Sequence, residues 1–262
     1  PHLILDPVAA SVRLVLTITG LVVALCLDGG QRRASPALAL SVLGLALVAE
    51  AASVSGLMLG LLLAMVAAGR LQQATGLVGR DGRGLALVGF AMAGFAGVLW
   101  SGLGGSVHFA EIRDGLAARP SLPALAIPLV MGLLLLGTAL ALLGTAWNAA
   151  MGRSRVVAAW LVAAPLLPLL AFSRHLLAPW PAAPHLHGAA LVPAVVGGVL
   201  MVASLGAALV QPDLPRRLVT SAPASLGLAW LGLAVLVPDA AARAGTAGLL
   251  LLVPSLVAAV VL

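Results

Sequence analysis

The stretch QPDLPRRLVTSAPASLGLAWLG, residues 211–232, joins two long apolar runs through a short polar turn. The first run ends at Val210, and the turn carries Asp213 and the pair Arg216–Arg217. A second apolar run follows directly, with Ser221 near its start. Apolar runs of ~18 residues or more are long enough to cross a bilayer as helices. The stretch therefore predicts two membrane spans joined by a turn with a cationic tip.

The composition of the whole chain agrees with this interpretation. Of its 262 residues, 62% are hydrophobic and 8% are charged, whereas a soluble domain carries roughly 25% charged residues. We therefore predict an all-α fold, a polytopic transmembrane helix bundle that forms one integral membrane domain over residues 1–262. The single cysteine, Cys26, excludes an internal disulfide and a thiolate metal site, and we expect it to be a buried small hydrophobe.

The apolar run 36–68 decides how many spans to expect. As one helix it would extend about 50 Å, against a hydrocarbon core of ~30 Å. It is therefore either one tilted helix or two short helices joined near Glu50–Ser53. With two short helices the chain has about nine spans, at residues 8–27, 36–50, 53–69, 84–105, 123–149, 156–173, 188–210, 219–237 and 244–262.

The distribution of arginine favours two short helices. The net charge of +6 comes wholly from arginine, because the chain has no lysine. Nine spans place nine loop arginines on one side of the membrane and four on the other, the asymmetry that the positive-inside rule requires. We therefore expect a bacterial inner-membrane protein with its N-terminus outside and its Arg216 loop in the cytoplasm. Arginines spread over membrane loops form no basic face, so we expect no nucleic-acid partner.

The stretch also resembles a family signature. Ala208-Leu209, Gln211, Asp213-Leu214, Arg216 and Leu226-Gly227 fit the pattern of the antiporter-like, proton-translocating subunits of complex I, membrane-bound hydrogenases and multi-subunit Na+/H+ antiporters. The closest resemblance is to the complex I subunit N-like type. It extends along nearly the whole chain, through Leu5-Asp6, residues 104–112 and residues 171–176. It implies part of the antiporter-like fold, in a shortened form.

The chain departs from that family where the family moves protons. The family's glutamate position falls on Met58, and its two lysine positions fall near Ala141 and near Leu166 or Leu167. Methionine, alanine and leucine cannot exchange protons, and a proton relay inside a membrane needs ionisable groups or water. The sequence therefore predicts a degenerate subunit that does not pump.

Three ionisable residues remain as candidates for a proton path. Glu50 is a glutamate within an apolar run, and such a carboxyl is a functional candidate by default. The alternative, which the arginine count favours, places it in a turn at the outer interface. Arg174 and His175 close the sixth span, and an interfacial histidine can shuttle protons near neutral pH. A solvated, anchoring role is the simpler interpretation of both.

Two further charged groups have structural interpretations. Arg13, inside the first span, snorkels outward or pairs with a carboxylate of a partner subunit. Asp213 caps the eighth span and pairs locally with Arg216 and Arg217, so that the signature becomes a docking turn. No group of residues has the spacing of a metal site; His185 and His187 have neither a carboxylate nor a cysteine beside them.

The leading functional hypothesis is a non-pumping, mainly structural membrane subunit of a complex I-like assembly or a related hydrogenase or antiporter. The expected partners are other membrane subunits and lipid. The chain itself would be non-catalytic and hold no cofactor, with quinone, iron–sulfur clusters and flavin belonging to partner subunits. Two alternatives stay open: an active proton or cation transporter subunit, and an unrelated polytopic permease.

Overall fold

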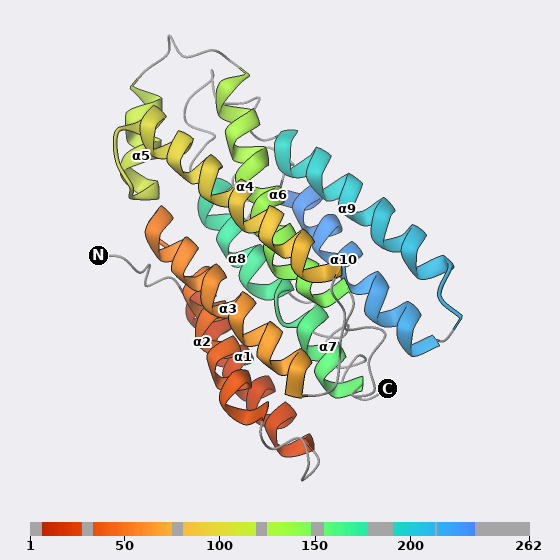
Figure 1. Ribbon diagram of the computed structural model, residues 1–262. Helices are drawn as coiled ribbons and strands as arrows, with labels where there is room; N and C mark the ends of the chain where they lie inside the picture. The colour runs from red at the N-terminus through yellow and green to blue at the C-terminus, as the bar shows by residue number, and fades with distance from the viewer. Residues whose placement is uncertain are drawn as a thin grey trace.

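The computed structural model describes residues 7–27, 34–74, 81–118, 125–147, 155–177, 191–212 and 214–233, and its described elements are all helices (Figure 1). This confirms the all-α fold. The helices are α1 (Pro7–Cys26), α2 (Ser35–Ala49), α3 (Val54–Ala74), α4 (Asp81–Gly104), α5 (Phe109–Ala117), α6 (Ala126–Trp147), α7 (Arg155–Ala163), α8 (Leu166–Leu177), α9 (Leu191–Leu209) and α10 (Leu214–Leu233).

Six helical segments in the described part of the chain are long and apolar enough to cross a membrane. They are Pro7–Cys26, Val54–Ala74, Arg83–Gly104, Ala126–Gly144, Val156–Arg174 and Leu191–Leu209, and each matches one predicted span. The predicted span 36–50 corresponds to the 15 residues of α2, which are apolar but short. The predicted span 219–237 corresponds to α10, which starts earlier and includes both arginines of the turn. The predicted span 244–262 lies outside the described residues.

The apolar run 36–68 forms two helices, not one. α2 ends at Ala49, Glu50 is its C-cap residue, and α3 starts at Val54. The two helices pack antiparallel, because Gly44 of α2 lies against Ala64 and Gly60 of α3 lies against Val48. The break falls where the sequence places Glu50-Ala-Ala-Ser, the least apolar part of the run.

Several helix pairs in the described part of the chain are packed through glycine at distances that admit no side chain. A Cβ atom at Gly44 would lie 2.5 Å from the backbone nitrogen of Ala64, which joins α2 to α3. One at Gly137 would lie 2.5 Å from the nitrogen of Ala93, which joins α4 to α6. One at Gly197 would lie 2.6 Å from the carbonyl oxygen of Gly227, which joins α9 to α10. Small residues allow such approach, and van der Waals packing drives helix association in lipid.

The segment Val156–Arg174 is the centre of the bundle. In this segment 94% of the residues of the span are buried by other helices, against 17% for Leu191–Leu209 in α9. The segment is interrupted at Ala164–Pro165, where α7 ends and α8 begins. Proline lacks the backbone N–H that an unbroken helix would donate. The break is enclosed by protein, where a membrane protein tolerates irregular backbone.

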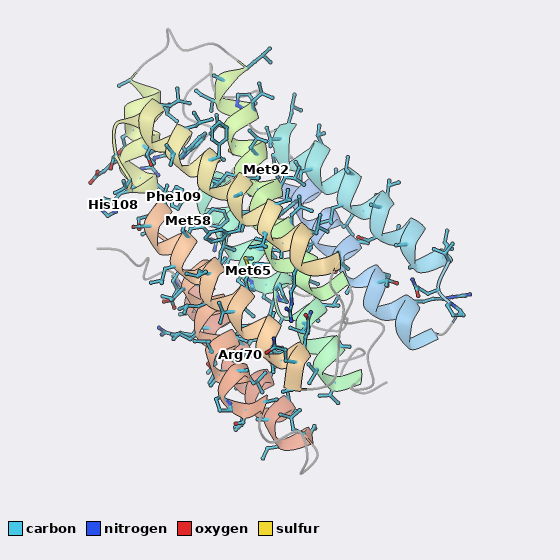
Figure 2. All side chains as sticks on the ribbon, in the orientation of Figure 1. Met58, Met65, Arg70, Met92, His108 and Phe109 are labelled. Carbon is cyan, nitrogen blue, oxygen red and sulfur yellow. The ribbon has the colours of Figure 1, made fainter. Side chains whose placement is uncertain are left out.

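The bundle has two ends, as the alternating course of its helices shows (Figure 1). We call the first the Glu50 end; it also holds the end of α4, the short helix α5 and the end of α8. We call the second the Arg217 end; it holds the end of α3 and the starts of α4 and α10. In Figure 2, His108 and Arg70 mark the two ends on either side of Met58 and Met65.

Large apolar side chains face outward along most of the bundle. The most exposed include Leu209 at 80%, Leu25 at 78% and Val98 at 70%. Soluble monomers rarely expose such contiguous apolar surface. Together with the six apolar segments, this surface indicates an integral membrane protein. Cys26 also lies on the exposed surface, at the end of α1, so the expectation that it is buried was wrong.

Candidate functional site

The interior of the bundle contains Met58, Ala141 and Leu166, the three positions that the proposed resemblance aligns with ionisable residues. Ala141 of α6 and Leu166 of α8 have no exposed surface. Met58 is partly buried on α3, and a Cβ atom at Gly94 of α4 would lie 3.1 Å from its methyl carbon. Figure 2 shows Met58 and Met65 along the same helix. All three positions are thus packed against neighbouring helices by apolar atoms.

A small cavity lies beside the break between α7 and α8. Its volume is about 10 Å³, and its lining includes Ser41, Met65, Ala141, Trp160 and Pro165. Apart from Ser41 and the indole of Trp160, the side chains around it are apolar. A cavity needs about 10–15 Å³ to hold one water molecule. The space beside Ala141 and Pro165 therefore has room for about one water.

Two buried tryptophan–serine hydrogen bonds tie the central segment to its neighbours. The indole N–H of Trp160 in α7 donates to the Ser41 hydroxyl of α2 at 3.1 Å. The indole N–H of Trp230 in α10 donates to the Ser173 hydroxyl of α8 at 2.8 Å. Ser173 in turn donates to the carbonyl of Leu170 at 2.8 Å. Buried polar groups need such partners, and these partners fix how α7 and α8 lie against α2 and α10.

Sequence reasoning did not find these four residues. Ser41 and Trp160 are 119 positions apart, and Ser173 and Trp230 are 57 apart. A serine inside an apolar run is common in membrane helices, since it can donate to the carbonyl one turn earlier. Nothing in the local sequence distinguishes a serine that also accepts from a distant indole.

Glu50 and Arg13 form an ion pair at the Glu50 end. The distance from the Arg13 guanidinium to the Glu50 carboxylate is 3.2 Å, and the two side chains are 55% and 9% exposed respectively. Glu50 lies in the turn between α2 and α3, as the arginine count indicated. Arg13 thus pairs with a carboxylate of its own chain, in place of the partner subunit's carboxylate that was the alternative expectation. Among the side chains that are buried in the described part of the chain, that of Glu50 is the only acidic or basic one.

The turn that holds Glu50 is joined to the loop before α5. The backbone N–H of Val54 donates to the carbonyl of Val107 at 3.0 Å, and that of Phe109 donates to the carbonyl of Ala52 at 2.9 Å. Phe109 also meets Phe172 of α8 edge to face, with ring centroids 5.6 Å apart. These contacts connect the turn between α2 and α3, the loop before α5 and helix α8 at one end of the bundle.

Arg174 and His175 lie in the last turns of α8, at the same end of the bundle. Arg174 is partly buried. The side chain of His175 lies outside the described residues, as do His185 and His187. Within the described part of the chain, no group of three or more His, Cys, Asp or Glu side chains has the arrangement of a metal site.

Arg217 at the start of α10 bonds back to the turn between α9 and α10, which we call the signature turn. The Nε of Arg217 donates to the carbonyl of Gln211 at 2.6 Å, and the N–H of Gln211 donates to the carbonyl of Ala208 at 3.2 Å. Arg217 thus bonds to a backbone carbonyl of the turn, and the predicted pairing of Asp213 with Arg216 and Arg217 stays a prediction. Asp213 and the side chain of Arg216 lie outside the described residues.

No family model, curated protein or solved structure matches this chain. The resemblance to antiporter-like subunits therefore remains a hypothesis drawn from the sequence alone.

Proposed function

We propose that this chain is a degenerate antiporter-like subunit that does not pump and serves mainly as a structural part of a complex I-like ion-translocating membrane assembly. The observation that carries the proposal is the apolar interior around Met58, Ala141 and Leu166. Two of these positions are fully buried, and the cavity beside Ala141 has a volume of about 10 Å³.

The size and lining of this cavity weigh against a proton path through the described bundle. A path across ~30 Å of hydrocarbon needs several ionisable groups or a chain of waters. One water fills about 10–15 Å³, so the cavity beside Ala141 cannot hold such a chain. Burying a charge at mid-membrane costs at least ~2.5–3.5 kcal/mol on insertion scales. A subunit that does not pump gains no function from a charge buried at mid-membrane, so apolar residues at these positions are expected.

Glu50, the remaining candidate within a described helical hairpin, has a structural partner. Its carboxylate lies 3.2 Å from Arg13 at the end of the bundle. An ion pair at a turn orients two helices without connecting the two sides of the membrane. We therefore assign Glu50 and Arg13 to helix orientation.

The rest of the proposal concerns the assembly. The chain has nine spans in the bacterial inner membrane, with the N-terminus outside and the Arg217 end in the cytoplasm. Exposed apolar faces such as that of α9, which carries Val195, Val199 and Val202, fit either lipid or helices of partner subunits. Quinone, iron–sulfur clusters and flavin belong to those partners.

Two measurements test this proposal. Purification in mild detergent should recover the chain with other membrane subunits in a stable stoichiometry. In that assembly, the double variant Glu50→Gln/His175→Ala should keep the wild-type ratio of protons moved to electrons transferred. A lower ratio at normal abundance and normal electron transfer would show that a path through this chain exists. Ion flux from the purified chain alone would favour an active transporter instead.

A further inference from the structure

An elongated groove lies between α6 and the pair α9/α10. Its volume is about 450 Å³, within the range of roughly 300–1,000 Å³ typical of small-molecule sites. Its lining on α9 extends from Val195 to Ala207, which is about 18 Å at 1.5 Å per residue. The buried indole of Trp230 contributes to its wall. The groove is thus long, narrow and parallel to a membrane-spanning helix.

The lining of the groove is apolar except toward one end. The polar side chains along it are Ser204 of α9, Gln211 in the turn between α9 and α10, and Thr220 of α10. Arg217 lies in the first turn of α10 with its side chain exposed, and its Nε donates to the carbonyl of Gln211. Arg83 is exposed near the start of α4, at the same end of the bundle, two residues before Leu85, which lines the groove. The groove therefore has an apolar length and a polar end, with two exposed arginines close to it in sequence.

The groove is open toward the space that lipid occupies. Val195 and Val199 line it and are 65% and 63% exposed. A hydrocarbon chain can therefore enter from the bilayer along α9, without passing through the bundle. An apolar chain alone would gain nothing from the polar end, whereas basic pockets between membrane helices bind anionic lipid head groups.

We propose that this groove binds an anionic phospholipid, with an acyl chain along α9 and the head-group phosphate at Arg217. The inference does not depend on whether the chain pumps protons. It assigns a ligand to the signature turn: the side-chain amide of Gln211 offers a donor to the head group, and Arg217 offers the charge. The Thr220 hydroxyl donates to the carbonyl of Arg217 at 3.1 Å and so supports the arginine. The bond from its Nε to Gln211 fixes the guanidinium beside the polar end and leaves its terminal N–H groups for a phosphate.

The test uses the full chain, with any subunits that co-purify, in a neutral detergent. Bound phospholipid is quantified by mass spectrometry after extraction, following exchange against equal amounts of an anionic and a zwitterionic phospholipid. The wild type should retain the anionic lipid selectively. Ala203→Trp fills the groove, and Val202→Trp is its control, because Val202 is 68% exposed on α9 and lies outside the groove lining. Arg217→Gln removes the charge, and Arg70→Gln is its control on α3.

The variants have distinct expected results. Ala203→Trp should abolish selective retention, while Val202→Trp should leave it unchanged. Arg217→Gln should weaken it about fivefold, the effect of one arginine near a membrane surface, and Arg70→Gln should not. Ala207→Leu, a smaller change in the same lining, serves if Ala203→Trp does not fold. Equal retention of both lipids by the wild type, or equal effects of a variant and its control, would overturn the proposal.

Discussion

At the scale of single residues, the ion pair between Arg13 and Glu50 is asymmetric. The side chain of Glu50 is 9% exposed and that of Arg13 is 55% exposed. Removing the arginine leaves a buried carboxylate without its counter-charge, whereas removing the carboxylate leaves an arginine that water or lipid head groups can still solvate. The cost of the two substitutions should therefore differ.

We predict that Arg13→Gln lowers the free energy of unfolding by about 1–3 kcal/mol, the cost of leaving a buried group unsatisfied. Glu50→Gln should cost less than about 1 kcal/mol, in the range of an exposed ion pair. Thermal unfolding in detergent, followed by tryptophan fluorescence, gives the order of the two. The double variant should be close to Glu50→Gln. An equal loss from both single variants would mean that the pair is not asymmetric.

At the scale of elements, two adjacent glycines of α9, Gly197 and Gly198, differ in how closely α10 approaches them. A Cβ atom at Gly197 would lie 2.6 Å from the carbonyl oxygen of Gly227, whereas one at Gly198 would meet nothing within 4 Å. Gly197→Ala must push the helices apart and should cost about 1–3 kcal/mol, as overpacking does. Gly198→Ala gains helix propensity and should be neutral or stabilising by up to about 1 kcal/mol.

The same unfolding measurement compares these neighbours in one helix, so effects of helix propensity are shared by both. Similar loss from both alanine variants would contradict the close α9/α10 contact. If only Gly197→Ala lowers the free energy of unfolding, a second substitution on α10 should not restore it. The atom nearest to the new methyl group is a backbone oxygen, which no side-chain substitution removes.

At the same scale, some helix boundaries could be predicted from the sequence alone, whereas the position of each helix in the bundle could not. The arginine count and the length of run 36–68 predicted the break near Glu50, because both are set by the fixed thickness of a bilayer. The break at Pro165 did not follow, because the missing N–H of proline favours a simple kink in a membrane helix as well as a break. The burial of α7 and α8 at the centre also did not follow, since the segment Val156–Arg174 has the same mean hydropathy as α9, which lies at the periphery. Which helix becomes central depends on packing among all of them.

At the scale of the whole molecule, the two ends carry different numbers of arginines. Among the described helices, five arginines lie at the Arg217 end: Arg70 of α3, Arg83 of α4, Arg155 of α7, and Arg216 and Arg217 of α10. Three lie at the Glu50 end: Arg13 of α1, Arg113 of α5 and Arg174 of α8. Arg113 is also partly offset there by Asp114, whose carboxylate it contacts at 3.0 Å. The positive-inside rule then predicts that the Arg217 end faces the cytoplasm.

Cysteine labelling tests this orientation, provided that Cys26 is first replaced by serine, because it is exposed and would react itself. In that background, Asp114→Cys on the exposed surface of α5 should react in intact cells with a thiol reagent that cannot cross the membrane. Gln73→Cys, exposed near the end of α3, should react only after the membrane is permeabilised. The two sites lie at opposite ends of helices that alternate in direction, so they must give opposite results whichever way the chain is inserted. Labelling of Gln73→Cys in intact cells with protection of Asp114→Cys would reverse the orientation. Labelling of both would contradict the alternating arrangement itself.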